Sequence, residues 1–454
     1  MSFRQFLSSY RIPILIILLL GLGLRVTLAV RFPQFAFDQT RYTAPAVNML
    51  AGHGFTSATG EPYLQTEHAV PLYPLFIAAV YAVFGEHNRA VLIAQSLIDL
   101  MTCLLVAFVS FNLAPDPLRR RAAILSLVIY GCLSWFTLIW TSYVLAETLA
   151  LFFTMLAVAL GIMALKGSRW WWPAAGATCG LALLTRADSV LLVLAFVLIL
   201  VFQIVREPTG AKAANLVLFC LAILLVLAPW VARNYVAFQK FQPLASEYGF
   251  DRDGYMPAGY LWWIRTWMID ETNFAVFKPA FVPGSHSFDP NELPDSVFDS
   301  AEERSQVSQM FSEYDRLGHF TPEMSGKFRT IANERIKRAP LRFLIWLPVQ
   351  RATSVWLTGF ATHNRFHRFL RMLLVLPILI GGTVGLVFLV RTQPFAQLLL
   401  LVVLTRTIFL AYHYAPESRY IVEAYPAMIA AGGVTGALLW RYLDRVWVKR
   451  FAGG

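Results

Sequence analysis

The sequence has few charged residues and few cysteines for its length. Of its 454 residues only 14% are Asp, Glu, Lys or Arg, whereas soluble domains carry about 25%. This shortage, with 57% hydrophobic residues, places the chain among membrane proteins. All four cysteines fall inside apolar stretches, without metal-ligand spacing: Cys103, Cys132, Cys179 and Cys220. They are interpreted as core or lipid-facing side chains, not as disulfide or metal partners.

Acidic residues are also scarce relative to basic ones, and the formal net charge is +11. The basic residues gather in short loops between apolar runs, which is the distribution that the positive-inside rule produces. A nucleic-acid groove would instead interleave Lys and Arg with exposed aromatics on a soluble segment. Because the sequence has no such segment, the positive charge indicates membrane topology, and no nucleic-acid partner is predicted.

Long apolar runs predict an all-α polytopic membrane protein, since about 20 mostly apolar residues cross a bilayer. The first run continues to Val30 without a clean cleavage motif, so it is interpreted as a retained span. The run 171–186 is short and contains Gly176 and Gly180, which predicts close packing against a neighbouring helix. The ten predicted spans are 12–30, 89–112, 122–140, 143–165, 171–186, 188–205, 214–235, 372–391, 394–411 and 420–440.

The stretch 341–361 decides between ten spans and eleven. Gln350 and Arg351 at its middle would be costly in lipid, which favours a re-entrant or surface-lying helix. With ten spans, both ends of the chain and most basic loops face the cytoplasm. The predicted organisation is a seven-span module over 1–236, an extracytoplasmic loop or small domain over 237–340, and a C-terminal module over 341–454.

The first outer loop, 31–88, is polar where it leaves the bilayer. It contains two amphipathic pieces, 39–52 and 70–84, which are predicted to lie along the membrane plane. Within 237–340, the aromatic stretch 259–267 offers rings that could stack on sugars or insert at the interface.

Acids, bases and tyrosines from distant parts of the sequence map to the same outer face. Taken singly, several have ordinary explanations: Arg41 as an interfacial anchor, Asp99 as a structural hydrogen-bond partner, and Asp38 as a helix cap. Glu147 and Arg406 lie below the interface, where charged groups normally face a polar cavity or each other. The candidate set is Asp38, Tyr42, Glu67, His68, Glu147, Arg186, Arg233, Arg406, Arg419 and Tyr420.

This convergence indicates an outer cavity for a lipid-linked anionic substrate. Arginine forks bind phosphate or pyrophosphate well. A nearby carboxylate can take a proton from a hydroxyl that attacks a neighbouring carbon.

Several blocks stand out along the sequence, in this order: "FDQTRY", "EHAVPLYPLFIAAVYAVFG", "YVLAETLALFF", "GLALLTRADSVLL", "APWVARNYVAFQKFQPL" and "PESRYIVEAYPAMIAAGG". In this order and spacing they resemble the GT-C superfamily of polytopic glycosyltransferases. The resemblance is to the bacterial branch related to protein O-mannosyltransferases and the aminoarabinose transferase of lipid A. It implies that a sugar moves from a polyprenyl-phosphate donor to an acceptor hydroxyl at the outer surface of the cytoplasmic (inner) membrane.

The resemblance also implies roles for particular residues. The acid of the family's first outer loop is the expected general base for an inverting attack, and it falls on Asp38. The second acidic position falls on Glu147, which would orient acceptor or sugar. Where the aminoarabinose transferase has Glu-Lys, this chain has Glu67-His68, and histidine is charged at neutral pH only if its pKa is raised.

Arginines are therefore the expected partners of the donor phosphate, namely Arg233, Arg406 and Arg419. Tyr42, Glu67, His68, Arg186 and Tyr420 complete the expected donor-binding set. Oligosaccharyltransferases, which are members of the same superfamily, use a divalent metal. The first outer loop lacks a "DxD"-type cluster, which favours a mechanism without a cofactor, and a divalent metal is the alternative.

The predicted partners are the lipid-linked donor, the bilayer, and a lipid, glycan or protein acceptor. One alternative is a flippase or transporter of a lipid-linked sugar, which should show internal repeats; none is detected. A second alternative is a polymerase or ligase of lipid-linked glycans, which shares the substrate class but uses different outer-loop residues.

Overall fold

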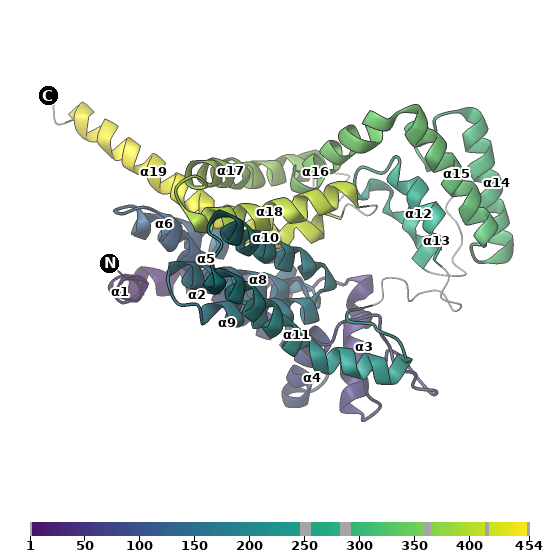
Figure 1. Ribbon diagram of the computed structural model, residues 1–454, viewed down its shortest axis with the longest axis horizontal. Helices are drawn as coiled ribbons and strands as arrows, with labels where there is room; N and C mark the ends of the chain where they lie inside the picture. The colour runs from purple at the N-terminus through teal and green to yellow at the C-terminus, as the bar shows by residue number, and fades with distance from the viewer. Residues whose placement is uncertain (1, 246–255, 282–291, 358–364, 414–416, 452–454) are drawn as a thin grey trace. The chain divides into compact units, whose positions relative to one another are not determined.

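The computed structural model describes residues 2–245, 256–281, 292–357, 365–413 and 417–451, and nearly all of its regular structure is helical (Figure 1). Among these residues, the one β pairing is an isolated bridge between Gln34 and Tyr143. The chain divides into two compact units. The first comprises 1–245, 373–405 and 422–454, and the second comprises 246–372 and 406–421. The predicted all-α polytopic fold is confirmed.

The first unit contains most of the long apolar helices. Its elements up to residue 245 are α1 (Phe3–Ser9), α2 (Arg11–Arg31), η1 (Phe37–Gln39), α3 (Thr40–Leu50), α4 (Leu72–Phe84), α5 (Asn88–Leu113), α6 (Arg119–Val128), η2 (Ile129–Leu133), α7 (Trp135–Leu138), η3 (Ile139–Ser142), α8 (Glu147–Lys166), α9 (Trp171–Thr185), η4 (Ala187–Ser189), α10 (Val190–Arg206) and α11 (Gly210–Phe238).

The second unit is built from shorter helices: α12 (Ala258–Arg265), η5 (Glu271–Phe277), α13 (Lys278–Phe281), η7 (Asp295–Val297), α14 (Ala301–Leu317), α15 (Pro322–Arg338), η8 (Arg342–Trp346) and α16 (Leu347–Leu357). Three later elements contribute residues to both units: α17 (Arg365–Leu389), α18 (Pro394–Tyr412) and η9 (Ser418–Ala424). The last helix, α19 (Tyr425–Phe451), belongs to the first unit.

Within the described residues, eight helices are long and apolar enough to cross a membrane. They coincide with eight of the ten predicted spans. The predicted third span is broken, because Arg119–Leu133 and Trp135–Ser142 meet at a bend of 56°. The predicted fifth span is α9, which has 15 residues and is shorter than the usual spanning length. The two predicted amphipathic pieces of the first outer loop correspond to α3 and α4.

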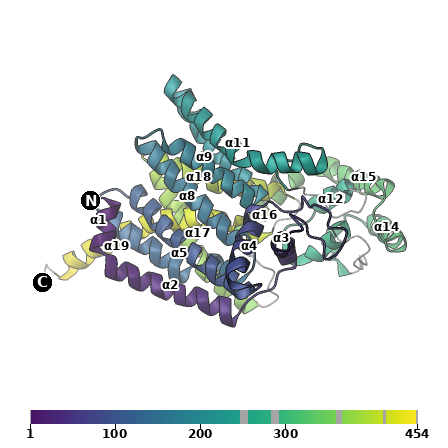
Figure 2. The same cartoon turned by 90° about the horizontal axis from the view of Figure 1, so that it is seen from below.

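Helix α9 packs closely against α11, as predicted from its glycines; Figure 2 shows the two helices side by side. A Cβ atom on Gly176 would lie 2.3 Å from the carbonyl oxygen of Phe219 in α11, and one on Gly180 would lie 2.8 Å from Cβ of Val226. Small residues therefore allow the two backbones to approach.

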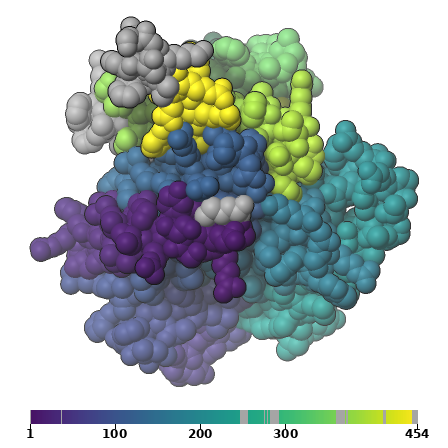
Figure 3. Space-filling view, turned by 90° about the vertical axis from the view of Figure 1, so that its left-hand side faces the viewer, coloured from purple at the N-terminus to yellow at the C-terminus, as the bar shows by residue number. Residues whose placement is uncertain are grey.

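Around α5, the N-terminal helices and α19 form the rest of the bundle. Figure 3 shows the purple α1–α2 segment against the blue α5 and α6, with the yellow α19 on the other side of α6. The Phe3 ring of α1 meets the Phe108 and Phe111 rings of α5 at 5.1 and 5.4 Å between centroids.

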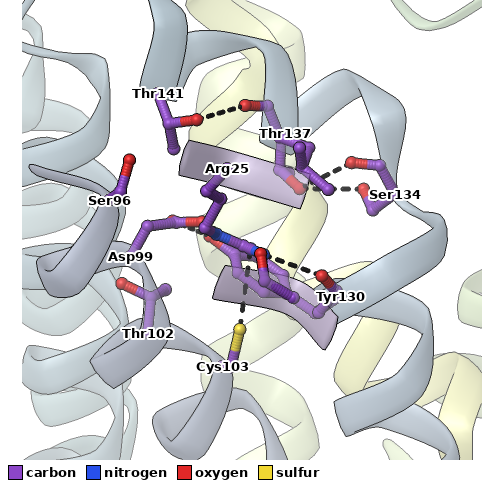
Figure 4. A network of polar contacts seen from close by, with 12 residues as sticks. Arg25, Ser96, Asp99, Thr102, Cys103, Tyr130, Ser134, Thr137 and Thr141 are labelled. Atoms are coloured by element: carbon purple, nitrogen blue, oxygen red, sulfur yellow. Dashed lines mark hydrogen bonds and ion pairs between the residues drawn. The ribbon is translucent and has the colours of Figure 1, made fainter. Parts of the chain in front are cut away.

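A fully buried polar network ties α2 and α5 to the broken span (Figure 4). Arg25 forms an ion pair with Asp99, with Nε donating to Oδ2 over 2.7 Å, and the Tyr130 hydroxyl donates to Oδ1 over 2.7 Å. Arg25 Nη1 also donates to the carbonyl of Gly131 in the π-helical turn η2, over 2.7 Å. The interpretation of Asp99 as a structural hydrogen-bond partner is confirmed.

The core of the second unit is aromatic. Tyr260 and Trp263 of α12 are fully buried against Phe311 of α14 and Phe328 of α15. The expectation that the stretch 259–267 presents rings to sugars or to the interface is thus wrong for these two side chains, because they fill the interior of a small helical domain.

The segment 341–361, described here up to residue 357, forms η8 and α16, and it is not among the candidate spans. Arg351, at the middle of the segment, is buried in the second unit. Its guanidinium donates to the carbonyl oxygens of Met268 (2.8 Å) and Arg265 (2.5 Å). Carbonyl groups of the protein thus solvate the charge of Arg351. The position of this helix relative to the bilayer stays a prediction.

The contact between α9 and α11 can be tested with two glycine substitutions. Gly176→Ala should lower the thermal unfolding temperature in detergent, because its Cβ collides with the Phe219 carbonyl; overpacking of this kind costs about 1–3 kcal/mol. Gly23→Ala in α2 is the matched control, since nothing lies within 4 Å of its Cβ. Equal unfolding temperatures for the two variants would contradict the close approach.

Candidate functional site

The first outer loop places Asp38 in η1, directly before α3. The cap position of α3 is held by Gln39, whose side chain makes no cap hydrogen bond. Asp38 lies one residue before that position, and the alternative interpretation of it as a helix cap stays a prediction. The main chain of the loop is fixed instead by the bridge partner Gln34, whose N–H donates to the carbonyl of Ser142 over 2.9 Å. This bond holds the loop beside the segment that leads to Glu147.

Tyr42, near the start of α3, lies among the charged candidates. Burial raises the pKa of its phenol above the ordinary value, and the charges of Arg41, Glu147, Arg186 and Asp38 all act on it. These groups come from the first outer loop, from the start of α8 and from the turn after α9. Four of the predicted site residues are thus brought together in one unit.

Arg186 is the centre of a buried ion cluster. It lies in an extended conformation between α9 and η4, and its guanidinium contacts three carboxylates. Nη1 is 2.5 Å from Glu147 Oε1, and Nε is 3.0 Å from Asp188 Oδ1 and 3.3 Å from Glu423 Oε1. Thr154 Oγ1 also donates to Glu423 Oε2 over 3.4 Å. The cluster joins α8, η4 and η9 through one cation.

Glu147 has one carboxylate oxygen that Arg186 does not contact. The side chain is only 2% exposed, and no described residue donates a hydrogen bond to Oε2. It is also the first residue of α8, where the helix dipole favours a negative charge. Buried polar atoms normally have a partner, so Oε2 is suited to accept a hydrogen bond from a bound hydroxyl.

Gln95 of α5 fixes the segment that leads to Glu147. Its Nε2 donates to the carbonyl oxygens of Thr141 (3.1 Å) and Tyr143 (2.6 Å), in the segment before Glu147. Its Oε1 accepts from the Tyr73 hydroxyl over 3.1 Å. The Tyr73 ring in turn meets the Tyr42 ring edge-on at 5.1 Å.

Arg233 of α11 binds the later part of the first outer loop. Nη1 donates to the carbonyl of Thr66 (3.0 Å), and Nη2 donates to the carbonyl of Phe55 (3.1 Å) and to Gln65 Oε1 (2.5 Å). The guanidinium also lies over three aromatic rings, including that of Trp230 at 5.0 Å. These contacts hold the loop, and the predicted role in phosphate binding is not tested.

Glu67 and His68 lie at the end of this loop. Glu67 pairs with Lys240 at 2.7 Å, and the carbonyl of His68 accepts from Arg41 Nε. Arg41, interpreted from the sequence as an anchor, therefore joins α3 to the loop. Burial lowers the pKa of His68, and the charges of Arg41 and Lys240 lower it further against the opposing effect of Glu67. A lowered pKa leaves the imidazole neutral near pH 7, and the predicted role of His68 in donor binding is not tested.

The remaining predicted residues lie in the second unit and contact one another. Arg406 Nη1 donates to the carbonyl of Tyr420 over 2.7 Å. Arg419 pairs with Glu417 at 2.5 Å, and its guanidinium lies 5.0 Å from the Tyr420 ring centre. The structure therefore describes two groups of candidates, each within its own unit.

Three residues of the first group were not among the predicted site residues: Asp188, Glu423 and Gln95. Glu423 was overlooked because it lies at the start of an otherwise apolar run. A carboxylate within a span is costly and normally marks a functional site, and this rule could have identified Glu423. In the described part of the chain, no group of three or more His, Cys, Asp or Glu side chains is arranged to hold a metal ion. The absence of a cofactor stays a prediction.

Comparison with known proteins supports the resemblance found in the sequence. Residues 67–232 match the family model described as dolichyl-phosphate-mannose-protein mannosyltransferase. No curated protein sequence matches the chain. The resemblance to the GT-C superfamily is thus confirmed by a family model over part of the chain.

Solved structures agree on the fold. The oligosaccharyltransferase of Archaeoglobus fulgidus, tethered with an acceptor peptide, has a TM-score of 0.54 and 14% identity over 99% of this chain and 52% of its own. A second structure of the archaeal enzyme AglB, in complex with an inhibitory peptide and a dolichol-phosphate, has a TM-score of 0.52. The chain thus shares the fold of these proteins while spanning about half of their length. ArnT from Cupriavidus metallidurans, bound to undecaprenyl phosphate, also matches, with a TM-score of 0.39 and 14% identity over 96% of this chain and 78% of its own.

The ion cluster predicts a large cost for losing its cation. Arg186→Gln removes the cation that pairs with the buried Glu147 and Glu423 and with the partly exposed Asp188, and breaking a buried pair in this way costs about 3–5 kcal/mol. The control is Lys212→Gln, which removes an ion pair whose Glu207 partner is 75% exposed; exposed pairs contribute about 0–1 kcal/mol. Thermal unfolding in detergent should separate the two variants clearly. Similar unfolding temperatures would mean that Arg186 does not hold the cluster together.

Proposed function

We propose that the protein is a GT-C type glycosyltransferase. It moves a sugar from a polyprenyl-phosphate donor to an acceptor hydroxyl at the outer surface of the cytoplasmic membrane, with Asp38 as the general base. The observation that carries the proposal is the position of Tyr42. The charges of Asp38, Glu147 and Arg186 all act on the pKa of its phenol. The mannosyltransferase family model, which spans residues 67–232, supports the same class of reaction.

The proposed reaction has three parts: removal of a proton, attack on the sugar, and departure of the lipid phosphate. Asp38 takes the proton of the acceptor hydroxyl as the acceptor oxygen attacks the anomeric carbon of the sugar. The bond from that carbon to the phosphate oxygen breaks, and the lipid phosphate leaves with the electron pair. Because the attack is direct and from the opposite face, the anomeric configuration inverts.

Glu147 is proposed to orient the sugar or the acceptor. Its Oε2 atom lacks a donor among the described residues, while Oε1 is fixed by Arg186. A carboxylate held on one side and open on the other positions a hydroxyl with little loss of freedom on binding. Tyr42 is also proposed to contact the donor.

Arg406 and Arg419 are the proposed partners of the donor phosphate, because a guanidinium is always charged and matches the phosphate geometry. Arg233 is proposed to act indirectly, through the loop that carries Glu67 and His68. The donor's lipid tail contributes roughly 0.8 kcal/mol of binding free energy per methylene buried in the bilayer. The protein therefore needs few polar contacts to bind the donor.

The general base is tested with purified protein, a radiolabelled polyprenyl-phosphate sugar and a panel of membrane acceptors. Asp38→Asn should lower the transfer rate about 10²–10⁴-fold, which is the usual contribution of a positioned base, while donor binding persists. Asp116→Asn, at an exposed site, should transfer at the wild-type rate. Transfer that survives Asp38→Asn undiminished would overturn the assignment. Donor movement across vesicles without sugar transfer would favour a flippase instead.

The neutral state of His68 gives a separate prediction. Because burial and nearby cations lower its pKa, a gain in phosphate binding from its protonation would appear only below about pH 6.5. The KM for the donor in wild type and in His68→Gln should therefore change in parallel between about pH 7 and about pH 8. A KM that rises with pH over this range in wild type alone would show that His68 is charged and binds the donor.

A further inference from the structure

One face of the second unit carries an apolar strip. The strip lies on η8 and the start of α16, and its five side chains are between 51% and 69% exposed: Leu341, Leu344, Ile345, Trp346 and Val349. The segment is not among the candidate spans of the described chain. A contiguous exposed apolar surface of this kind marks a contact with a partner or a membrane.

Two polar-tipped aromatic side chains accompany the strip. Trp346 belongs to it, and Tyr412 is 42% exposed and donates its hydroxyl to the carbonyl of Leu344 over 2.9 Å. Trp and Tyr are enriched where one end of the ring meets hydrocarbon and the other meets water. This composition favours a bilayer surface over a protein partner.

Arg265, the last residue of α12, lies directly beside the strip. Its guanidinium lies over the rings of Trp262 and Phe343, at 4.9 and 5.3 Å from their centres. Phe343 is the buried neighbour of Leu344 in η8. Arg265 Nε is buried without an acceptor, and no carboxylate of the described chain pairs with the side chain. The cation is held by aromatic faces alone.

A second cation adjoins the first. Arg351 donates to the carbonyl of Arg265, and it too has no carboxylate partner among the described residues. Burial and then the charge of Arg265 lower the pKa of Arg351 to about 10. Two neighbouring arginines without a counter-ion repel each other, and an anion bound at Arg265 would offset that repulsion.

We propose that this face lies on the membrane surface and that Arg265 binds the phosphate of an anionic phospholipid of the bilayer. The apolar strip enters the acyl boundary, Trp346 and Tyr412 lie at headgroup level, and the guanidinium reaches the phosphate. None of these residues is among those proposed to bind the donor, and the proposal does not depend on glycosyl transfer.

The test uses the full chain in phosphatidylcholine nanodiscs that contain a phosphatidylglycerol probe with a photoreactive headgroup. Mass spectrometry of the digest reports which peptides are labelled. Peptides containing Arg265 and the strip should be labelled in wild type. Arg265→Gln should reduce that labelling about fivefold, as expected for one arginine near an anionic membrane surface. Arg265→Lys, which keeps the charge, should retain more of the labelling.

Arg316→Gln is the matched control, because Arg316 is an exposed arginine of α14 and its loss should leave the labelling unchanged. Thermal unfolding of each variant shows whether it is folded. Equal labelling of wild type and a folded Arg265→Gln variant would overturn the proposal. So would equal labelling by a phosphatidylcholine probe, since the contact would then be apolar only. Competition by excess inorganic phosphate or by polyprenyl phosphate would assign the site to a free anion or to the donor.

Discussion

The arrangement of the candidate site depends on one buried cation. Arg186 contacts Glu147, Asp188 and Glu423, three carboxylates that would otherwise repel one another in a poorly solvated interior. A buried charge is costly unless it is paired and hydrogen-bonded, so the ends of α8, α9 and η9 must meet where they do. The same ion pair fixes one oxygen of Glu147 and leaves the other without a donor. The contact between Arg186 and Glu147 therefore contributes both to stability and to the proposed chemistry.

Two polar side chains of helix α5 fix the segments of the chain that lead to that contact. Gln95 and Asp99, one helical turn apart, are both fully buried; Gln95 bonds to the segment before Glu147, while Asp99 pairs with Arg25 next to the bend. The broken span is what allows the chain to turn beside the first outer loop. Gln95 thus positions the segment before Glu147, because its amide satisfies carbonyl groups that a continuous helix would bond internally.

Much of the fold could be predicted from the sequence, since apolar runs and membrane thickness decide where most spans lie. The break at Ser134 could not, because it follows no proline and depends on a donor from α2, Arg25, and on an acceptor from α5, Asp99. Asp38, Tyr42, Glu147 and Arg186 were predicted to share one outer face, and in the structure the charges of the other three act on Tyr42; their roles stay predictions. Glu423 was missed within an apolar run. The stretch 259–267 misled because Tyr260 and Trp263 fill a small core, and aromatic composition alone does not distinguish a core from a binding surface.

The central claim is that the sugar of a lipid-linked donor reacts beside Tyr42. The most direct measurement is a cryo-electron microscopy structure of the protein in nanodiscs with a non-reactive polyprenyl-phosphate sugar analogue. The account predicts that the sugar ring contacts Tyr42, with one hydroxyl in hydrogen-bond distance of Glu147 Oε2 and the anomeric carbon facing Asp38. A sugar bound without contact to any of these three residues would contradict it.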